Sequence, residues 1–332
     1  MKEIRAAIAG TGSYLPEKVL TNDDLSRMVD TSDEWIYPRT GIRSRRIAGP
    51  QEQTSDMAAE AGRRALQAAG AAPGEIDLLV VATISGDSPL PATACLVQEK
   101  LGLRNATAFD VLAACSGFLF ALDVARQYVR SGAARKVLVV GAEKMSAITD
   151  WTDRTTCILF GDGAGAAVVQ PAEEGSGNGI LASLTGSDGS LAPLLHIEAG
   201  GSALPTSAET LAAKRGFVKM DGHTIFKYAV RNMAGVALRA VEEAGLKPAD
   251  VDWIVPHQAN IRIIQAVAKT MDAPMEKVVA TIERTGNTTA ASIPLALDEA
   301  VRDGRIKPGD NVLFVAFGAG LTWASSVVRW GR

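Results

Sequence analysis

The stretch AGAAPGEIDLLV at residues 69–80 returns as AGLKPADVDWIV at residues 244–255, which lies 175 positions later and aligns without a gap. Both stretches have the pattern of a helix end, a turn and a buried strand. Gly70 and Gly245 end their helices, where the backbone φ angle becomes positive, and a proline opens the turn that follows. The nearly continuous apolar run after the turn is typical of a strand covered on both faces. The repeat therefore predicts a duplicated fold, in which the residues after the two strands meet at the axis that relates the halves.

The composition is that of an ordinary globular protein, with 332 residues, 47% hydrophobic and 21% charged, and a net charge of -3. This weak charge gives no general attraction to nucleic acid or to anionic membranes, so we expect neither as a partner. The first residues, MKEIRAAIAG, lack the apolar segment of a signal peptide, and no apolar run is long enough to span a bilayer. We therefore expect a cytoplasmic protein.

The chain has three cysteines, Cys95, Cys115 and Cys157, and three histidines. An odd number of cysteines without CxxC spacing argues against a disulfide framework and against a zinc site. Three histidines are too few for a histidine-rich metal centre. We expect no metal and no cofactor, and we expect Cys95 and Cys157 to be core residues.

Strands and helices alternate in the same order in both halves of the chain. A predicted helix at 55–69 corresponds to one at 228–244. After each repeated strand the sequence predicts a strand, a helix and a further strand, at 108–112, 115–130 and 136–141 and again at 278–282, 288–302 and 311–317. Alternating strands and helices imply right-handed crossovers.

The predicted architecture is α/β, with five α/β/α/β/α layers and two mainly parallel mixed sheets. Its halves are 1–175 and 176–332. Glycine and serine are frequent between residues 173 and 201, so we expect residues 176–218 to form connecting loops and hairpins.

Cys115 is a candidate nucleophile because it lies in VLAACSGFLFAL, between a predicted buried strand and an amphipathic helix. A lone cysteine in apolar surroundings is more often a small buried residue. At a helix N-terminus, however, NH groups favour the thiolate, so we expect the pKa of Cys115 to be lowered. Asn287, in GNTTAAS, occupies the equivalent junction of the second half, and His257, in VPHQAN, follows the repeated strand. Ligands bind beyond the carboxyl ends of strands in such folds, so these three side chains should share one pocket suited to acyl transfer.

Four motifs, ACSGF, VPHQANIRI, GNTTAASIP and FGAGLTW, resemble in order and spacing those of β-ketoacyl-ACP synthase III, the initiating condensing enzyme of type II fatty-acid synthesis. The similarity runs essentially end to end and implies a thiolase-like duplicated fold. It implies that Cys115 takes a primer acyl group, most simply acetyl, from a CoA thioester in a ping-pong reaction. His257 and Asn287 would stabilise the enolate formed by decarboxylation of malonyl-ACP. Backbone NH groups of Cys115 and Ala319 would form an oxyanion hole, although many members have Gly in place of Ala319.

The resemblance also implies binding residues, with the adenine of CoA held between Trp35 and Arg154. The implied CoA-binding residues are Thr31, Trp35, Arg39, Arg154, Gly222, Phe226 and Asn260. The implied ACP-binding residues are Lys227, Arg262 and Lys269, and the implied acyl pocket consists of Leu90, Phe160 and Phe317. Leu90 would reach the pocket across a homodimer interface, at a position where well-known members have Phe. Primer length and branching stay open.

Two other functions stay open, and one is rejected. A relative that serves polyketide or other secondary metabolism would share the same three side chains, and a non-catalytic acyl-CoA-binding protein is a rival from another class. Thiolases and elongating synthases are disfavoured because they resemble Cys/His/Cys and Cys/His/His sets. The sequence FGDGAGAAVV from Phe160 has the glycines of a dinucleotide-binding loop, but a β-like apolar run follows them where a phosphate site requires a helix N-terminus. We therefore expect no NAD.

Overall fold

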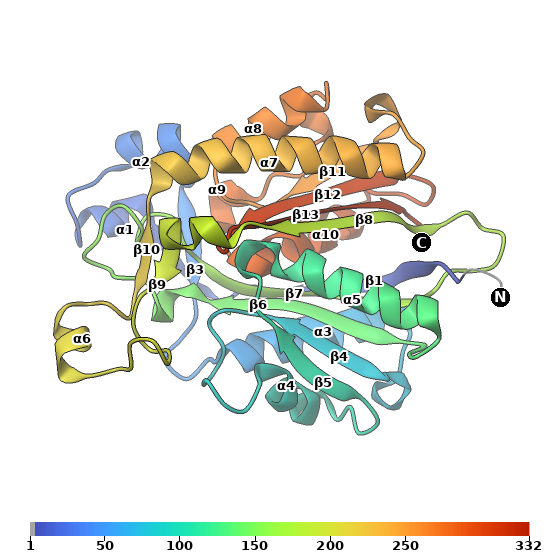
Figure 1. The fold of residues 1–332 in the computed structure, drawn as a ribbon, viewed down its shortest axis with the longest axis horizontal. Helices are drawn as coiled ribbons and strands as arrows, with labels where there is room; N and C mark the ends of the chain where they lie inside the picture. The colour runs from blue at the N-terminus through green and yellow to red at the C-terminus, as the bar shows by residue number, and fades with distance from the viewer. Residues whose placement is uncertain (1–3, 332) are drawn as a thin grey trace.

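The duplication is visible in the element boundaries of the computed structural model, which describes residues 4–331 (Figure 1). The corresponding pairs are α3 (Thr54–Ala69) with α7 (Gly222–Glu243), β4 (Leu78–Ala82) with β11 (Trp253–Pro256), α5 (Gly117–Ser131) with α10 (Ser292–Arg302), and β6 (Val137–Lys144) with β12 (Asn311–Gly318). The first residues of β4 and β11 are 175 positions apart, as are those of α5 and α10. The predicted duplicated fold is confirmed.

Two mixed sheets carry the fold. The first has five strands in the order β1-β7-β6-β4-β5, and the second has four in the order β11-β12-β13-β8. The remaining strands of these sheets are β1 (Ala6–Tyr14), β5 (Thr107–Val111), β7 (Asp162–Pro171), β8 (Gly179–Ser187) and β13 (Thr322–Arg329). In the first sheet, β4 pairs in parallel with β5 and β6, whereas in the second only β11 and β12 are parallel. Both sheets are mixed, as predicted, but neither is mainly parallel, since β7 also pairs antiparallel with β1 and with β6 in the first sheet.

Local causes explain this difference. Residues 278–282, predicted as a strand, make one bridge, between Val278 and Ile254, before helix α9 (Ile282–Thr285) begins. Strands β12 and β13 follow each other after a short turn, and a short connection joins antiparallel strands. The segment expected to contain connecting loops and hairpins also contributes β8, which pairs with β13. The apolar pattern identified buried segments but did not distinguish a strand from a short helix.

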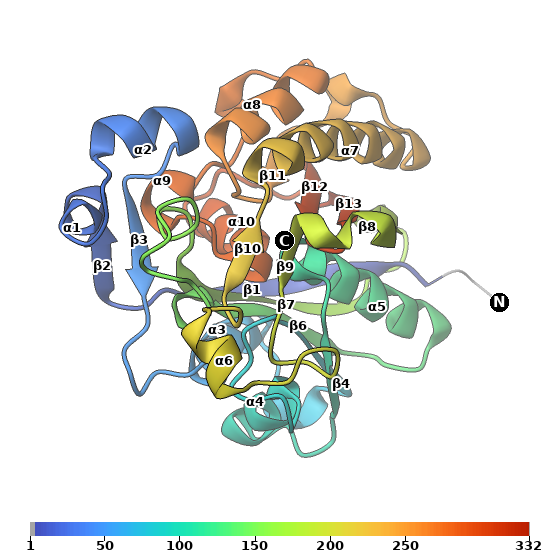
Figure 2. The same cartoon turned by 60° about the vertical axis from the view of Figure 1, so that its left-hand side comes forward.

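The core divides into layers on the two faces of each sheet (Figures 1 and 2). Helices α5 and α10 lie between the sheets, where the predicted inward residues of α5 are buried: Phe118, Leu122, Ala125 and Val129. Helix α3 and helix α4 (Thr93–Leu101) cover the outer face of the first sheet. Helix α7 and helix α8 (Ile261–Thr270) cover the outer face of the second. The five predicted layers are confirmed.

Short elements surround one end of these layers. They are β2 (Lys18–Thr21), α1 (Asn22–Ser26), α2 (Asp33–Thr40), β3 (Ser44–Ile47), β9 (Leu195–Ile197), α6 (Ala208–Ala212) and β10 (Val218–Met220). Gly163 and Gly165 of the sequence that resembles a dinucleotide-binding loop lie in strand β7, and Gly161 directly precedes it, so a strand follows these glycines as predicted. Cys157 is buried, but Cys95 is exposed on α4, so the prediction for Cys95 is wrong. None of the helices in residues 4–331 is long and apolar enough to cross a membrane.

Candidate active site

The three candidate catalytic side chains, Cys115, His257 and Asn287, line one cavity of about 110 Å³. They come from both halves of the duplication: Cys115 comes after β5, His257 comes directly after β11, and Asn287 comes after the short helix α9. The sequence therefore predicted their convergence correctly. The other residues of the lining are Leu159, Phe160, Leu195, Met220, Gly222, Ile225, Phe226, Ala229, Met233, Ala259, Asn260, Ile263, Phe317 and Gly318.

Cys115 lies in a 3-10 turn, Ala114–Ser116, directly before α5 rather than inside that helix. Its neighbour Ala114 has a φ angle of 45°, which is strained for a residue with a Cβ. Burial raises the pKa of the Cys115 thiol to about 12, the charge of Glu143 adds to this effect, and the Thr289 hydroxyl partly offsets it. The expected lowering of this pKa is wrong, because the loss of hydration outweighs the nearby helix N-terminus.

The turn after Asn287 repeats this strained geometry. Thr289 lies 175 positions after Ala114 and has a φ angle of 49°. Its backbone N–H donates to Asn287 Oδ1 at 2.9 Å, so the amide NH₂ of Asn287 is the donor available to the cavity. The spacing of 175 pairs Cys115 with Ala290, three residues after Asn287, so Asn287 is not the register equivalent of Cys115 as the sequence suggested.

The backbone of Asn287 is fixed by the segment before β7. Its N–H donates to Leu159 O at 2.8 Å, and its carbonyl accepts from Gly161 N at 3.0 Å. Both bonds join the second half of the chain to the first. The position of the amide therefore depends on contacts between the halves.

His257 follows β11 directly and is 2% exposed. Its N–H donates to Val315 O at 2.8 Å, and its Nδ1 lies 2.7 Å from the hydroxyl of Ser292. Burial lowers the pKa of the imidazole to about 3. At neutral pH His257 is therefore uncharged and has one ring proton.

Gly318, which the sequence analysis did not identify, packs against the backbone of Cys115. A Cβ on Gly318 would lie 2.7 Å from Cys115 N and 3.1 Å from Cys115 Cβ. The residue 175 positions earlier is Glu143, which is fully buried. Burial raises the pKa of its carboxyl to about 7, although a hydrogen bond from the backbone of Ala290 acts in the opposite direction. A carboxylate thus faces the backbone N–H of Ala290, whereas a glycine, which has no side chain, lies beside the equivalent N–H of Cys115. Aligning the two repeats at a spacing of 175 would have identified Gly318 and Glu143 as equivalent positions.

Towards the surface, the cavity continues to residues implied for CoA. Gly222, Phe226 and Asn260 line it, and Asn260 Nδ2 donates to Arg39 O at 2.9 Å. The guanidinium groups of Arg39 and Arg154 each lie 4.7 Å from the ring centre of Trp35.

Trp35 and Arg154 are therefore adjacent, as predicted, but they touch each other. A flat ring held between them needs about 7 Å, since each face requires about 3.5 Å. Arg154 also binds Asp30 through its backbone and side-chain oxygens. An adenine would enter this position only if Arg154 moved. Thr31 lies next to Asp30, and its hydroxyl is buried without a partner among the described residues.

The remaining predicted residues divide between the cavity and the surface. Phe160 and Phe317 line the cavity, whereas Leu90 is 85% exposed and Ala319 is absent from the lining. The three basic residues implied for ACP binding are exposed on α7 and α8: Lys227, Arg262 and Lys269.

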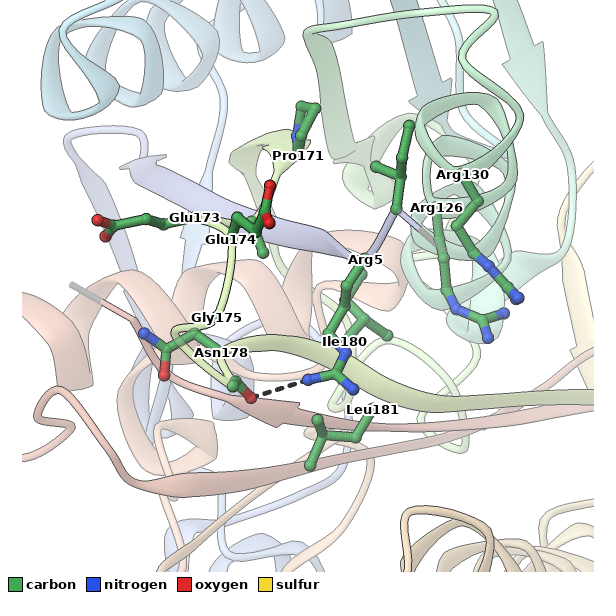
Figure 3. A pocket seen from close by; sticks show the side chains of 13 residues that line it. Arg5, Arg126, Arg130, Pro171, Glu173, Glu174, Gly175, Asn178, Ile180 and Leu181 are labelled. Atoms are coloured by element: carbon green, nitrogen blue, oxygen red, sulfur yellow. Dashed lines mark hydrogen bonds between the residues drawn. The ribbon is translucent and has the colours of Figure 1, made fainter. Parts of the chain in front are cut away.

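A larger cavity lies elsewhere. It has a volume of about 660 Å³ and is lined by Arg5, Arg126, Arg130, Glu173 and Glu174, among others, around the far end of α5 (Figure 3). It contains no nucleophile, and Arg126 there pairs with Asp123. Within residues 4–331, no cluster of histidine, cysteine and acidic side chains could hold a metal ion. The cavity at Cys115 is therefore the site with the groups needed for chemistry.

Known proteins match the chain over its whole length. Residues 109–189 match the family model described as 3-oxoacyl-(acyl-carrier-protein) synthase III, and residues 241–330 match the model of its C-terminal part. A protein of Caldanaerobacter subterraneus subsp. tengcongensis named beta-ketoacyl-(acyl-carrier-protein) synthase III is 53% identical over 331 residues, which cover 100% of this chain and 99% of that protein.

Solved structures agree with this similarity. The crystal structure of 3-oxoacyl-(acyl-carrier-protein) synthase III from Aquifex aeolicus VF5 has a TM-score of 0.91 at 48% identity, and the match covers 98% of this chain and 100% of that one. The priming beta-ketosynthase from the R1128 polyketide biosynthetic pathway has a TM-score of 0.92 at 40% identity, covering 100% of this chain and 98% of that one.

Proposed function

The chain belongs to the 3-oxoacyl-(acyl-carrier-protein) synthase III family of condensing enzymes that initiate fatty-acid synthesis, and we propose that it joins a short acyl group from CoA to malonyl-ACP. The products are 3-oxoacyl-ACP, CO₂ and CoA. The observation that carries this proposal is the convergence of Cys115, His257 and Asn287 in one cavity. The cycle uses acyl-CoA as a substrate and requires no cofactor.

In the first step the sulfur of Cys115 attacks the thioester carbonyl of acyl-CoA. The acyl-sulfur bond to CoA breaks, and the proton of the Cys115 thiol ends on the departing CoA thiol. The carbonyl oxygen becomes negatively charged in between, and the open backbone N–H of Cys115 beside Gly318 supports its role as one donor of the oxyanion hole. We assign the second donor to the backbone N–H of Ala319, which follows Gly318.

In the second step malonyl-ACP loses CO₂ and leaves an enolate, whose carbon attacks the acyl-Cys115 thioester. This forms the new carbon–carbon bond and releases the Cys115 thiolate, which takes a proton from water. Negative charge develops on the ACP thioester oxygen. The neutral imidazole of His257 and the NH₂ group of Asn287 are hydrogen-bond donors suited to stabilise it without ion-pairing.

The cavity favours a short primer, with acetyl as the simplest. Its volume of about 110 Å³ is small, and most of the side chains that line it are apolar. Leu90 is outside the cavity lining and 85% exposed, which supports a role at the cavity of a partner subunit.

We also propose a homodimer. Strand β5 has a strand neighbour on one side, and Leu112, directly after it, is 80% exposed. An open strand edge and exposed leucines favour pairing with a second copy. The exposed basic residues of α7 and α8 would attract an acidic ACP despite the net negative charge. The three free cysteines fit the reducing cytoplasm.

A second candidate is the priming of a polyketide pathway. The R1128 priming ketosynthase, at 40% identity and nearly full coverage, favours it. The chemistry at Cys115 would be the same, and the difference would lie in the primer and in the ACP that is recognised.

Intact-protein mass spectrometry tests the function. The protein would be incubated with acetyl-, isobutyryl- and longer acyl-CoAs, and then with malonyl-ACP. We expect an acyl adduct that is absent in Cys115→Ser and that disappears as 3-oxoacyl-ACP forms. An adduct that persists with malonyl-ACP would contradict the condensing role, and a preference for long or branched primers would favour the second candidate.

A further inference from the structure

The side chain of Ser292 is aimed at the imidazole of His257. Ser292 is the first residue of α10 and is 1% exposed. Its hydroxyl oxygen lies 2.7 Å from His257 Nδ1 and accepts from the backbone N–H of Gln258 at 3.4 Å. No other partner of this hydroxyl is found in the part of the chain that the structure describes. The ring nitrogen available to the cavity is therefore Nε2.

The hydrogen-bonding groups around Ser292 indicate which ring nitrogen of His257 has the proton. A serine hydroxyl has one hydrogen to donate, and within residues 4–331 the only acceptor in position is His257 Nδ1. If Nδ1 had the proton instead, the buried hydroxyl hydrogen would have no acceptor, and a buried donor without an acceptor is unfavourable. Burial keeps the imidazole uncharged, so the ring has a single proton, and donation by Ser292 to Nδ1 favours Nε2 as its position.

The first half of the chain supplies an internal comparison. Gly117 and Ala82 lie 175 positions before Ser292 and His257. A Cβ on Gly117 would be 3.1 Å from Ala82 Cβ, so the same two positions are in contact in both halves. The half with an apolar residue at the strand end has no hydroxyl facing it, and the half with histidine has one. A serine is therefore present in the half that has the histidine and absent from the half that has alanine there, so the fold itself does not require it.

We propose that Ser292 is a positioning residue, whose hydroxyl donates to His257 Nδ1 and thereby holds the proton on Nε2, where it serves the enolate oxygen. This inference rests on the proposed roles of His257 and Cys115. It makes His257 a donor in the decarboxylation step, and it leaves Nε2 without a lone pair to accept the Cys115 proton. Loss of Ser292 should therefore impair decarboxylation and spare acylation.

The ring proton can be observed directly in the unmodified protein. The chain has three histidines, so ¹⁵N-histidine labelling gives a small number of imidazole signals, and His257→Gln identifies those of His257. We expect Nδ1 to have the shift of an unprotonated ring nitrogen and Nε2 that of a protonated one. A protonated Nδ1 in the wild type overturns the proposal, whatever the variants do.

The variant Ser292→Ala tests the consequence for the reaction. We expect malonyl-ACP decarboxylation to fall roughly 10-fold to 100-fold, because one of the two donors is no longer oriented. Acylation by acyl-CoA should change less than about 2-fold. The matched control is Ser325→Ala, since Ser325 is equally buried but donates to Phe314 O, away from the cavity.

The outcomes separate this inference from the proposed function. If the wild type does not decarboxylate malonyl-ACP, the proposed function fails. If the wild type is active and Ser292→Ala matches it, or if Ser292→Ala loses acylation to the same extent as decarboxylation, the role of Ser292 is wrong and the proposed function stands. Selective loss in Ser292→Ala with normal rates in Ser325→Ala supports it.

Discussion

Replacement of Gly318 by alanine should block acylation of Cys115. The added Cβ would lie 2.7 Å from Cys115 N, whereas an ordinary contact is about 3.5 Å, so the two backbone segments must separate by roughly 0.8 Å. Both segments are buried, and overpacking of this kind costs about 1–3 kcal/mol. An oxyanion donor must lie about 2.7–3.1 Å from the oxygen, a range narrower than this displacement. We therefore expect acylation to slow about 100-fold, as for the loss of one donor.

The assay is the rate of Cys115 acylation by acyl-CoA, followed by intact-protein mass spectrometry, with thermal unfolding to confirm that the variant is folded. The matched control is Gly235→Ala in α7, where an added Cβ would meet nothing within 4 Å. This control should acylate normally and gain about 0.5–1 kcal/mol of stability, since alanine is the better helix former. A folded Gly318→Ala variant that acylates at the wild-type rate would refute the assignment of the Cys115 N–H as an oxyanion donor.

Three further predictions concern stability and binding. Arg45 is fully buried and donates to Leu20 O and Ile158 O, so Arg45→Met should lower the free energy of unfolding by about 3 kcal/mol in urea titrations. A loss below 1 kcal/mol, as expected for an exposed arginine, would contradict this role. Burial lowers the pKa of His257 from 6.5 to about 3, so the unfolded chain binds a proton that the folded chain excludes, and stability should fall as the pH drops through this window. His257→Gln should make the decline shallower; an unchanged pH profile would count against the buried neutral imidazole. Trp35→Ala should raise the KM for acyl-CoA about tenfold, because the ring beside Arg39 and Arg154 is lost, and should leave malonyl-ACP decarboxylation unchanged. Equal effects on both substrates would place Trp35 outside the CoA site.

The repeat in the sequence predicted more of the site than a search for single motifs could. The two repeated strands end at equivalent places in the two halves. Because Cys115 and His257 both come after these strands, their positions already implied a shared cavity. The register also contained two signals that the sequence analysis did not use. The two halves differ at two aligned positions beside the catalytic candidates. Gly318 aligns with Glu143, and Ser292 aligns with Gly117.

The errors have physical causes that local sequence does not express. The pKa of Cys115 depends on burial by residues from both halves, so a helix N-terminus alone gave the wrong direction. Residues 278–282 are as apolar as a strand, yet the chain turns into α9 after one bridge. Leu90 is outside the cavity in a single chain, and its role in the acyl pocket of a partner stays a prediction.

The sequence by itself determined the duplicated architecture, the layers and the identity of the three catalytic candidates, because periodicity and repeat spacing are properties of neighbouring residues. The tertiary structure alone decided the protonation of Cys115 and His257, the open N–H beside Gly318 and the contact of Ser292 with Nδ1. These features arise from hydration lost and hydrogen bonds formed between segments far apart in the chain. Their energies are set by distance and burial, which exist only once both halves are packed together.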